Sequence, residues 1–187
     1  MRTLVGNAAV FNSLSHDLGG FRERIAQGAF AQSLKKADVY FLNGHRPEIP
    51  VARQSAGNLE LKETSEGLRF RVTPSDTTAG RDLVKLVDDG ILDSMSFGFF
   101  VPDAESERFF EDRQGRIIRE VLRAEIIEVS AVPFPAYPAT SLRVESAATA
   151  PRSLEVVGGT RSNAQRRRIG KKRLEVGRMR KKAMGFR

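Results

Sequence analysis

The stretch SMSFGFFV, residues 94–101, alternates large apolar side chains with small ones. Successive side chains of a β-strand point to opposite faces of the sheet, so this alternation sorts the two kinds onto separate faces. The aromatic face is expected to pack into a core. The other face carries Ser94, Ser96 and Gly98, which leaves open space above Ser96. The stretch therefore predicts a strand with one buried face and one accessible serine.

Strands are also predicted on both sides of this stretch. Residues 59–62 and 68–72 alternate apolar and charged side chains around the turn Ser65-Glu66-Gly67, which is typical of an antiparallel hairpin. Residues 3–11 and Val39–Leu42 are further strand candidates, and Asn43-Gly44 follows the second with turn chemistry. Residues 117–132 form a long β-rich run of one or two strands, which Pro133-Phe134-Pro135 ends.

Two helices are predicted. Ile25–Leu34 fits a short helix in spite of Gly28. A second helix follows the N-cap candidates Asp76-Thr77-Thr78, with Leu83, Leu86 and Val87 on one face and Gly90 as its C-terminal stop. Strands outnumber helices, so we expect an α+β, β-rich fold. A small antiparallel β-barrel or curled sheet with a few helices fits best.

The charge of +8 is concentrated at one end of the chain. Residues 161–187 hold 12 of the 31 Lys and Arg residues and one acid, so residues 1–160 keep 19 bases and 22 acids, a net of −3. We therefore expect a domain over residues 1–146, followed by a linker and a basic, disordered tail over 147–187. No run of 18 apolar residues predicts a membrane span, and the N-terminus is a poor secretory signal, so the expected location is cytoplasmic.

Several kinds of chemistry are excluded. The chain has no cysteine, so it offers no thiol nucleophile or disulfide, and its two histidines cannot form a three-histidine zinc site. It lacks HExxH, a P-loop, GxGxxG and the GxSxG elbow. We expect neither cofactor nor metal.

A serine, a histidine and an acid remain for nucleophilic catalysis, which needs a hydroxyl, a base within hydrogen-bond reach and a group that holds the base. Ser96 lies on an open strand face, and His45 follows a strand and a glycine. Glu128 shares a predicted strand face with Ala124, Ile126 and Ser130, where an unpaired carboxylate is costly.

The residue pattern alone leaves alternatives open. A serine in a strand is most often a packing residue, a histidine after a turn is most often solvated, and Glu128 fits an outward position on an edge strand equally well. His16, in the polar stretch SLSHDLGG, is the rival base.

Three segments in order, NGHRPEIPVAR, DGILDSMSFGF and EIIEVSAVPFPAYPAT, resemble the prohead maturation proteases of tailed phages. The resemblance runs from about Arg22 to Ala139, and Gly28-Ala29-Phe30 also has a counterpart in that family. The family is a distant relative of the herpesvirus assembly protease, which implies a β-barrel surrounded by helices.

The resemblance also implies roles for single residues. The base falls on His45, the nucleophile on Ser96 and not on Ser94, and the acid on Glu128. Arg46 follows His45 where the family usually has Asp or Asn. Glu125 remains the alternative acid, although strict alternation puts it on the opposite face from Glu128.

The function implied by the resemblance is a serine endopeptidase that acts inside the prohead, in the host cytoplasm, during capsid assembly. Its implied substrates are the scaffolding segment of the major capsid protein, or a separate scaffold, and the protease itself. An oligomer inside the prohead is also expected. The alternative is an inactive capsid-assembly or scaffold protein that retains the fold.

The basic tail has three interpretations: a solvated arm, a segment that docks on acidic capsid or scaffold surface, or a nucleic-acid-binding segment. Gly170 and Gly177 interrupt any helix, and Phe186 is the only aromatic residue in the tail. A base-stacking platform is therefore disfavoured. The net −3 of residues 1–160 argues against nucleic acid as a partner of the domain.

Overall fold

The structure, a computed structural model, describes residues 2–145. The domain predicted for residues 1–146 lies almost entirely within this range, whereas the basic tail lies outside it. The strands are β1 (Leu4–Val10), β2 (Arg22–Ile25), β3 (Tyr40–Asn43), β4 (Arg46–Arg53), β5 (Leu59–Glu63), β6 (Gly67–Val72), β7 (Ser94–Phe100), β8 (Glu107–Glu111), β9 (Ile117–Val121), β10 (Glu125–Val132) and β11 (Ser141–Val144). The helices are α1 (Thr78–Asp88) and the short 3₁₀ helices η1 (Ser33–Lys35), η2 (Gln54–Ala56) and η3 (Ala104–Ser106).

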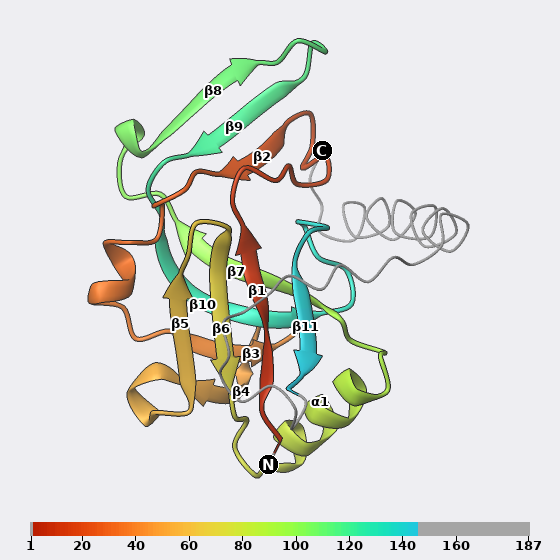
Figure 1. The fold of residues 1–187 in the computed structure, drawn as a ribbon. Helices are drawn as coiled ribbons and strands as arrows, with labels where there is room; N and C mark the ends of the chain where they lie inside the picture. The colour runs from red at the N-terminus through yellow and green to blue at the C-terminus, as the bar shows by residue number, and fades with distance from the viewer. Residues whose placement is uncertain (1, 146–187) are drawn as a thin grey trace. The chain divides into compact units, whose positions relative to one another are not determined.

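The described strands form three sheets, with the orders β11-β1-β6-β5, β4-β3-β10-β7 and β2-β9-β8. In Figure 1 the first sheet lies in front of the second, and the third lies beyond one end of both. Aromatic residues join the two larger sheets, for example Phe41 of β3 and Phe70 of β6, whose ring centroids are 5.4 Å apart. The core lies between these two sheets.

The β-rich α+β class is confirmed, but of the two predicted forms, a barrel or a curled sheet, the closed barrel is wrong. None of the three sheets among residues 2–145 closes on itself. Pairing is not purely antiparallel either, because β3 runs parallel to β10 and β2 runs parallel to β9. The likeness to the herpesvirus protease fold stays a prediction.

Most predicted elements are confirmed close to their expected bounds. The hairpin forms as β5 and β6, the run 117–132 divides into β9 and β10, and the strand over 94–101 is β7. Helix α1 begins after Thr77, whose side chain accepts a hydrogen bond from the backbone N–H of Gly80 at 3.1 Å. Gly90, with φ of 69°, follows the C-cap as predicted.

The helix predicted over Ile25–Leu34 is wrong. Gly28 has φ of 87°, in the left-handed region that a continuous right-handed helix excludes. The chain instead makes two successive β-turns before η1 begins. In the first the N–H of Ala29 donates to the carbonyl of Ala26, and in the second the N–H of Ala31 donates to that of Gly28.

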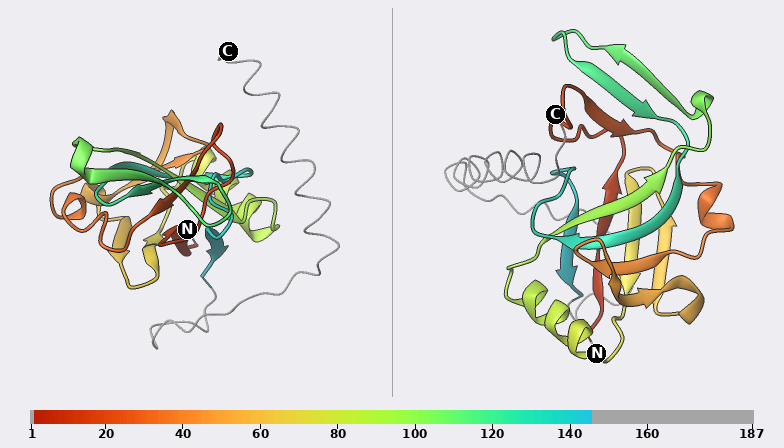
Figure 2. Two further views of the ribbon diagram at one scale, coloured as in Figure 1. Left: turned by 90° about the horizontal axis from the view of Figure 1, so that it is seen from above. Right: turned by 180° about the vertical axis from the view of Figure 1, so that it is seen from behind.

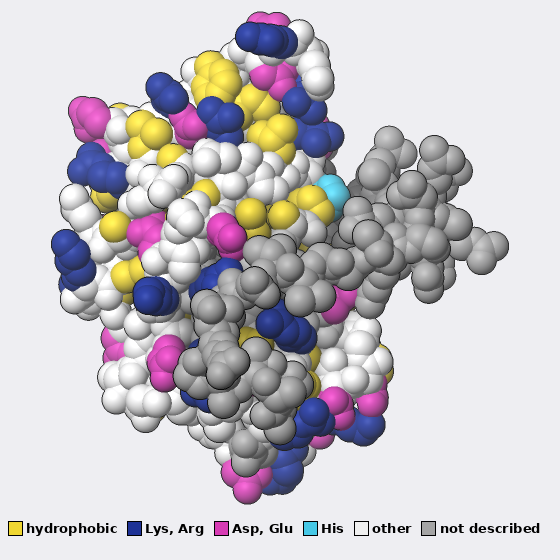
Figure 3. Space-filling view, in the orientation of Figure 1, with side chains coloured by type: hydrophobic (Ala, Val, Ile, Leu, Met, Phe, Trp, Pro, Cys, Tyr) yellow, Lys and Arg dark blue, Asp and Glu magenta, His cyan; other side chains and the backbone are white. Residues whose placement is uncertain are grey.

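The third sheet carries alternating charges that pair across its strands. Glu23 and Glu120 are both 4% exposed. Glu120 accepts hydrogen bonds from Arg24 and Arg108, and Glu23 accepts one from Arg119. Apolar side chains lie among the cations over this part of the surface, where Phe109 and Ile117 are exposed (Figure 3). Within the described range, none of the helices is long and apolar enough to cross a bilayer.

Candidate active site

The sheet β4-β3-β10-β7 brings the predicted site residues onto neighbouring strands. The views in Figure 2 show β7 and β10 as paired, strongly curved strands, with β3 beside β10. Ser96 lies in β7, Glu128 lies in β10, and His45 lies in the turn between β3 and β4. Three separate segments of the sequence therefore meet in one sheet.

His45 is held by an unusual two-residue turn. Asn43 pairs with Arg46, so only Gly44 and His45 connect the two strands. Both have positive φ, 72° for Gly44 and 60° for His45, as in the type I′ turns that fit tight hairpins. A non-glycine residue in this region is uncommon, and such outliers gather at functional sites. The turn places the imidazole over β10.

Glu128 is the direct partner of His45. Its Oε1 lies 2.6 Å from Nδ1 of the imidazole, and its side chain is 11% exposed against 43% for His45. An acid on Nδ1 orients the ring and leaves Nε2 for a nucleophile. The arrangement suits a general base held by a carboxylate.

Ser130 links both of these residues and was not predicted as part of the site. Its hydroxyl donates to Oε2 of Glu128 at 2.5 Å and accepts a hydrogen bond from the backbone N–H of His45 at 3.1 Å. It is fully buried. The only sequence signal for it was its position two residues after Glu128, on the same strand face.

Ser96 lies directly opposite Ser130 across the antiparallel pair of β7 and β10. Side chains of directly opposed residues share one face of the sheet, so Ser96 lies on the face that carries Glu128. Among the described residues no hydrogen bond joins Ser96 to His45; the hydrogen bonds of His45 run to Glu128 and Ser130. Ser94, the neighbouring candidate, is 7% exposed, and its hydroxyl donates to Asp93 at 2.7 Å.

A bulge in β10 corrects the expected faces of that strand. The register passes from Ile126↔Phe99 to Glu128↔Gly98, so Ile127 is an extra residue. Ile126 therefore lies on the core face, not beside Glu128 as strict alternation predicted.

The same bulge corrects the position of the alternative acid. Glu125 is the register partner of Phe100, which shares a face with Gly98, the partner of Glu128. Glu125 therefore lies on the same face as Glu128 and not on the opposite one. Its carboxylate is 3.0 Å from the ammonium of Lys36, and that of Glu128 contacts His45.

Two further contacts hold β7 from its outer edge. The hydroxyl of Thr140 accepts from the N–H of Met95 at 3.1 Å and donates to its carbonyl at 2.9 Å, so it binds the residue before Ser96. The ring of Tyr137 stacks on Phe97, with centroids 5.2 Å apart. Residues on both sides of Ser96 are thereby fixed by the segment after β10.

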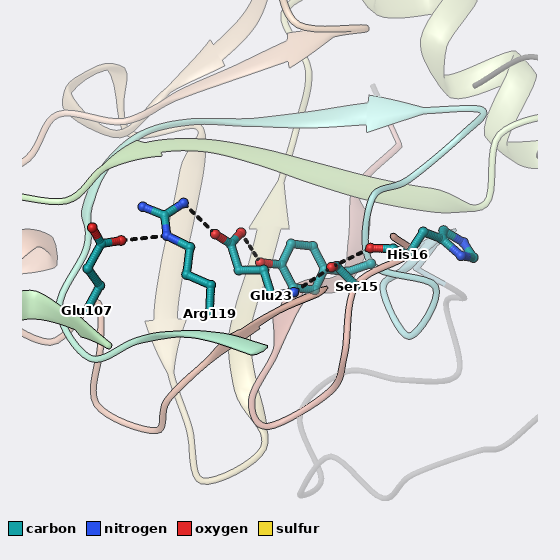
Figure 4. Close-up of polar contacts among 6 residues, drawn as sticks. Ser15, His16, Glu23, Glu107 and Arg119 are labelled. Atoms are coloured by element: carbon teal, nitrogen blue, oxygen red, sulfur yellow. Dashed lines mark hydrogen bonds and ion pairs between the residues drawn. The ribbon is translucent and has the colours of Figure 1, made fainter. Parts of the chain in front are cut away.

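Tyr137 is anchored in turn by a row of charged residues, Glu23, Arg119 and Glu107, of which Glu23 is buried; Figure 4 shows this row. Its hydroxyl donates to Glu23 at 2.5 Å, and Arg119 donates to Glu23 at 2.6 Å and to Glu107 at 2.5 Å. Burial, and next the charge of Glu23, raise the pKa of the Tyr137 phenol far above its usual range.

The rival histidine lies elsewhere in the described fold. His16 is in the loop between β1 and β2, where its backbone N–H donates to Ala136 at 2.8 Å and its carbonyl accepts from Ser15 (Figure 4). Within residues 2–145, no group of three or more acidic or histidine side chains is arranged to hold a metal ion.

A comparison with protein families identifies the relationship. A family model described as the caudovirus prohead serine protease matches residues 1–153. The chain belongs to this family. A search of the curated proteins found no match. Membership supports a serine protease of phage proheads, and the family match covers every candidate site residue named above.

Proposed function

We propose that this chain is a prohead serine endopeptidase in which Ser96, His45 and Glu128 form the catalytic triad. The observation that carries the proposal is the 2.6 Å contact between Glu128 and Nδ1 of His45, on the sheet face that also carries Ser96. Family membership supports the reaction class. The proposed substrates are scaffolding segments of the capsid protein, or a separate scaffold, and the protease itself, inside a prohead assembling in the host cytoplasm.

The mechanism is acyl transfer. Oγ of Ser96 attacks the carbonyl carbon of the scissile peptide while Nε2 of His45 takes the hydroxyl proton. When the tetrahedral intermediate collapses, the carbon–nitrogen bond breaks and His45 gives that proton to the leaving amine. Water then attacks the acyl-enzyme by the same proton transfers and releases Ser96. Glu128 holds the imidazole and stabilises its charged form throughout.

Co-expression with a candidate capsid protein tests the proposal. On a gel, the wild-type protein should shorten the capsid protein, and Ser96→Ala should leave it at full length. Loss of a triad member typically lowers the rate on the order of 10⁴-fold or more. His45→Ala should likewise be inactive.

Ser94→Ala and His16→Ala are the matched controls, since each removes the nearest residue of the same type. Both should process the capsid protein as the wild type does. Processing by Ser96→Ala together with failure by Ser94→Ala would reassign the nucleophile. Full-length capsid protein with every variant, wild type included, would favour an inactive assembly protein instead.

A further inference from the structure

Two large apolar side chains are exposed on the sheet face that carries Ser96. Phe100 is 55% exposed, and positions 96, 98 and 100 of β7 share one face. Ile127, the extra residue of the β10 bulge, is 52% exposed. The opposite face of this sheet packs against the core, so a half-exposed isoleucine in β10 lies on the outward face.

Between Ser96 and Phe100, the side chain of Glu128 lies over Gly98, which has no side chain of its own. A Cβ at that position would lie 2.7 Å from Oε1 of Glu128. The charged residue opposite Phe100 is Glu125, and its carboxylate already pairs with Lys36. Along β7 this face thus presents Ser96, then Gly98 with the Glu128 side chain over it, and then Phe100, with Ile127 on the neighbouring strand.

The spacing along β7 matches that of an extended peptide. Four residues of strand span roughly 13 Å at about 3.3 Å per residue. A substrate that lies extended along β7, with its scissile carbonyl at Ser96, has the same rise per residue as the strand. Its side chain four residues from the scissile bond therefore reaches Phe100, and Ile127 lies diagonally across on β10, between the register partners of Phe99 and Gly98.

We propose that Phe100 and Ile127 form an apolar subsite for the substrate side chain four residues from the scissile bond. The inference rests on the proposed function, because it places the scissile bond at Ser96. The occupant is an extended polypeptide with a leucine-like side chain at that position. Burial of one such side chain typically changes kcat/KM by about 10- to 200-fold.

The test uses the full-length protein and a proteome-derived peptide library, with cleavage sites mapped by mass spectrometry. Peptides built on the most frequent site then carry Leu, Asp or Lys at the fourth position on either side of the cleaved bond. We expect Leu to be favoured over Asp at one of these positions, by about tenfold or more. Phe100→Asp and Ile127→Asp should each lower kcat/KM for the Leu peptide by about tenfold, mainly through KM. Both should improve cleavage of the Lys peptide.

Phe109→Asp is the matched control, because Phe109 is 57% exposed but lies in β8 of the third sheet. It should cleave as the wild type does. Cleavage that depends on Ser96 but is unchanged by Phe100→Asp and Ile127→Asp overturns the subsite alone. A smaller oligomer in either variant, with unchanged kcat/KM, would assign the patch to contact between copies and overturn it too. No Ser96-dependent cleavage in the library would overturn the proposed function and the subsite together.

Discussion

Glu128 contacts His45 from the face of β10 that also carries Ser130. The bulge puts Glu125 and Glu128 on one sheet face, so position in the strand does not separate the two acids. Their partners separate them, because the carboxylate of Glu125 contacts Lys36 and that of Glu128 contacts Nδ1 of His45. At the scale of single residues, the choice of the acid rests on these contacts.

Replacing Glu128 by glutamine tests that choice. The amide keeps the size of the side chain but cannot stabilise an imidazolium, so kcat should fall by roughly 10³- to 10⁴-fold. Peptide cleavage kinetics measure the change, and thermal unfolding checks that the fold is kept. Glu125→Gln is the matched control and should retain nearly full activity. The opposite ranking of the two variants would move the acid to Glu125.

At the scale of elements, Gly98 of β7 leaves room for the side chain of Glu128 on the neighbouring strand β10. In Gly98→Ala the new methyl group would lie 2.7 Å from Oε1 and 3.2 Å from Cγ of Glu128. The φ of Gly98 is not positive, so alanine fits its backbone. The carboxylate is the part that must move.

We therefore expect Gly98→Ala to lose roughly 100-fold in kcat/KM, because a shift of about 1 Å at a catalytic group has an effect of that size. The unfolding free energy should change by no more than about 1 kcal/mol. Ser94→Ala, four residues before Gly98 on the same face, should keep its activity. Unchanged kinetics in Gly98→Ala would show that the position of Glu128 does not matter.

The segment after β10 is tied to β2 through the hydrogen bond from Tyr137 to Glu23. The stability that this bond contributes should fall at alkaline pH. Burial keeps the folded phenol protonated, whereas an unfolded tyrosine ionises near pH ~10. The contribution of Tyr137 is therefore fully present below pH ~10 and is lost as pH rises further. The slope should be about 1.4 kcal/mol per pH unit.

Tyr137→Phe should be less stable by about 1–3 kcal/mol at neutral pH, because buried Glu23 loses a donor. The difference from the wild type should shrink above pH ~10. Urea unfolding at several pH values measures both effects. Tyr40→Phe, at the other tyrosine of the chain, is the control. A difference that stays constant with pH would be inconsistent with a buried, protonated Tyr137.

Local patterns predicted the elements well, and contacts distant in sequence explain the rest. The hairpin β5–β6 and helix α1 follow from alternation, turn residues and caps that lie within a few positions of one another. The bulge at Ile127 has no such signal, because an inserted residue inside an apolar strand looks like any other. The role of Ser130 depends on a partner 85 positions away, His45.

At the scale of the whole molecule, β11 is the last strand described, and it closes one sheet edge against β1. Just after it, the N–H of Glu145 donates to Thr3 at 2.8 Å, and its carboxylate binds Arg71 at 3.0 Å. The domain boundary predicted near residue 146 stays a prediction. The two parallel strand pairs, each joining segments far apart in sequence, explain why a simple antiparallel barrel was not found.

A protein ending at Ser146 keeps all of these contacts and should fold and cleave peptides at the wild-type rate. We predict that it enters heads poorly, because the 12 cations of residues 161–187 are suited to an acidic capsid or scaffold surface. Copy number in purified immature heads measures this. A protein ending at Thr140 lacks β11 and should not fold. Normal incorporation without the tail would refute docking, and loss of peptide cleavage would assign the tail to the catalytic domain.

Covalent labelling of the nucleophile tests the central claim most directly. A fluorophosphonate reacts with a serine that a neighbouring base activates, and trypsin then releases residues 86–108, which contain both Ser94 and Ser96. Fragmentation of this peptide in the mass spectrometer should locate the adduct on Ser96. The adduct should be absent in His45→Ala and unchanged in His16→Ala. An adduct on Ser94, or full labelling of Ser96 in His45→Ala, would contradict the assignment of Ser96 and His45 as nucleophile and base.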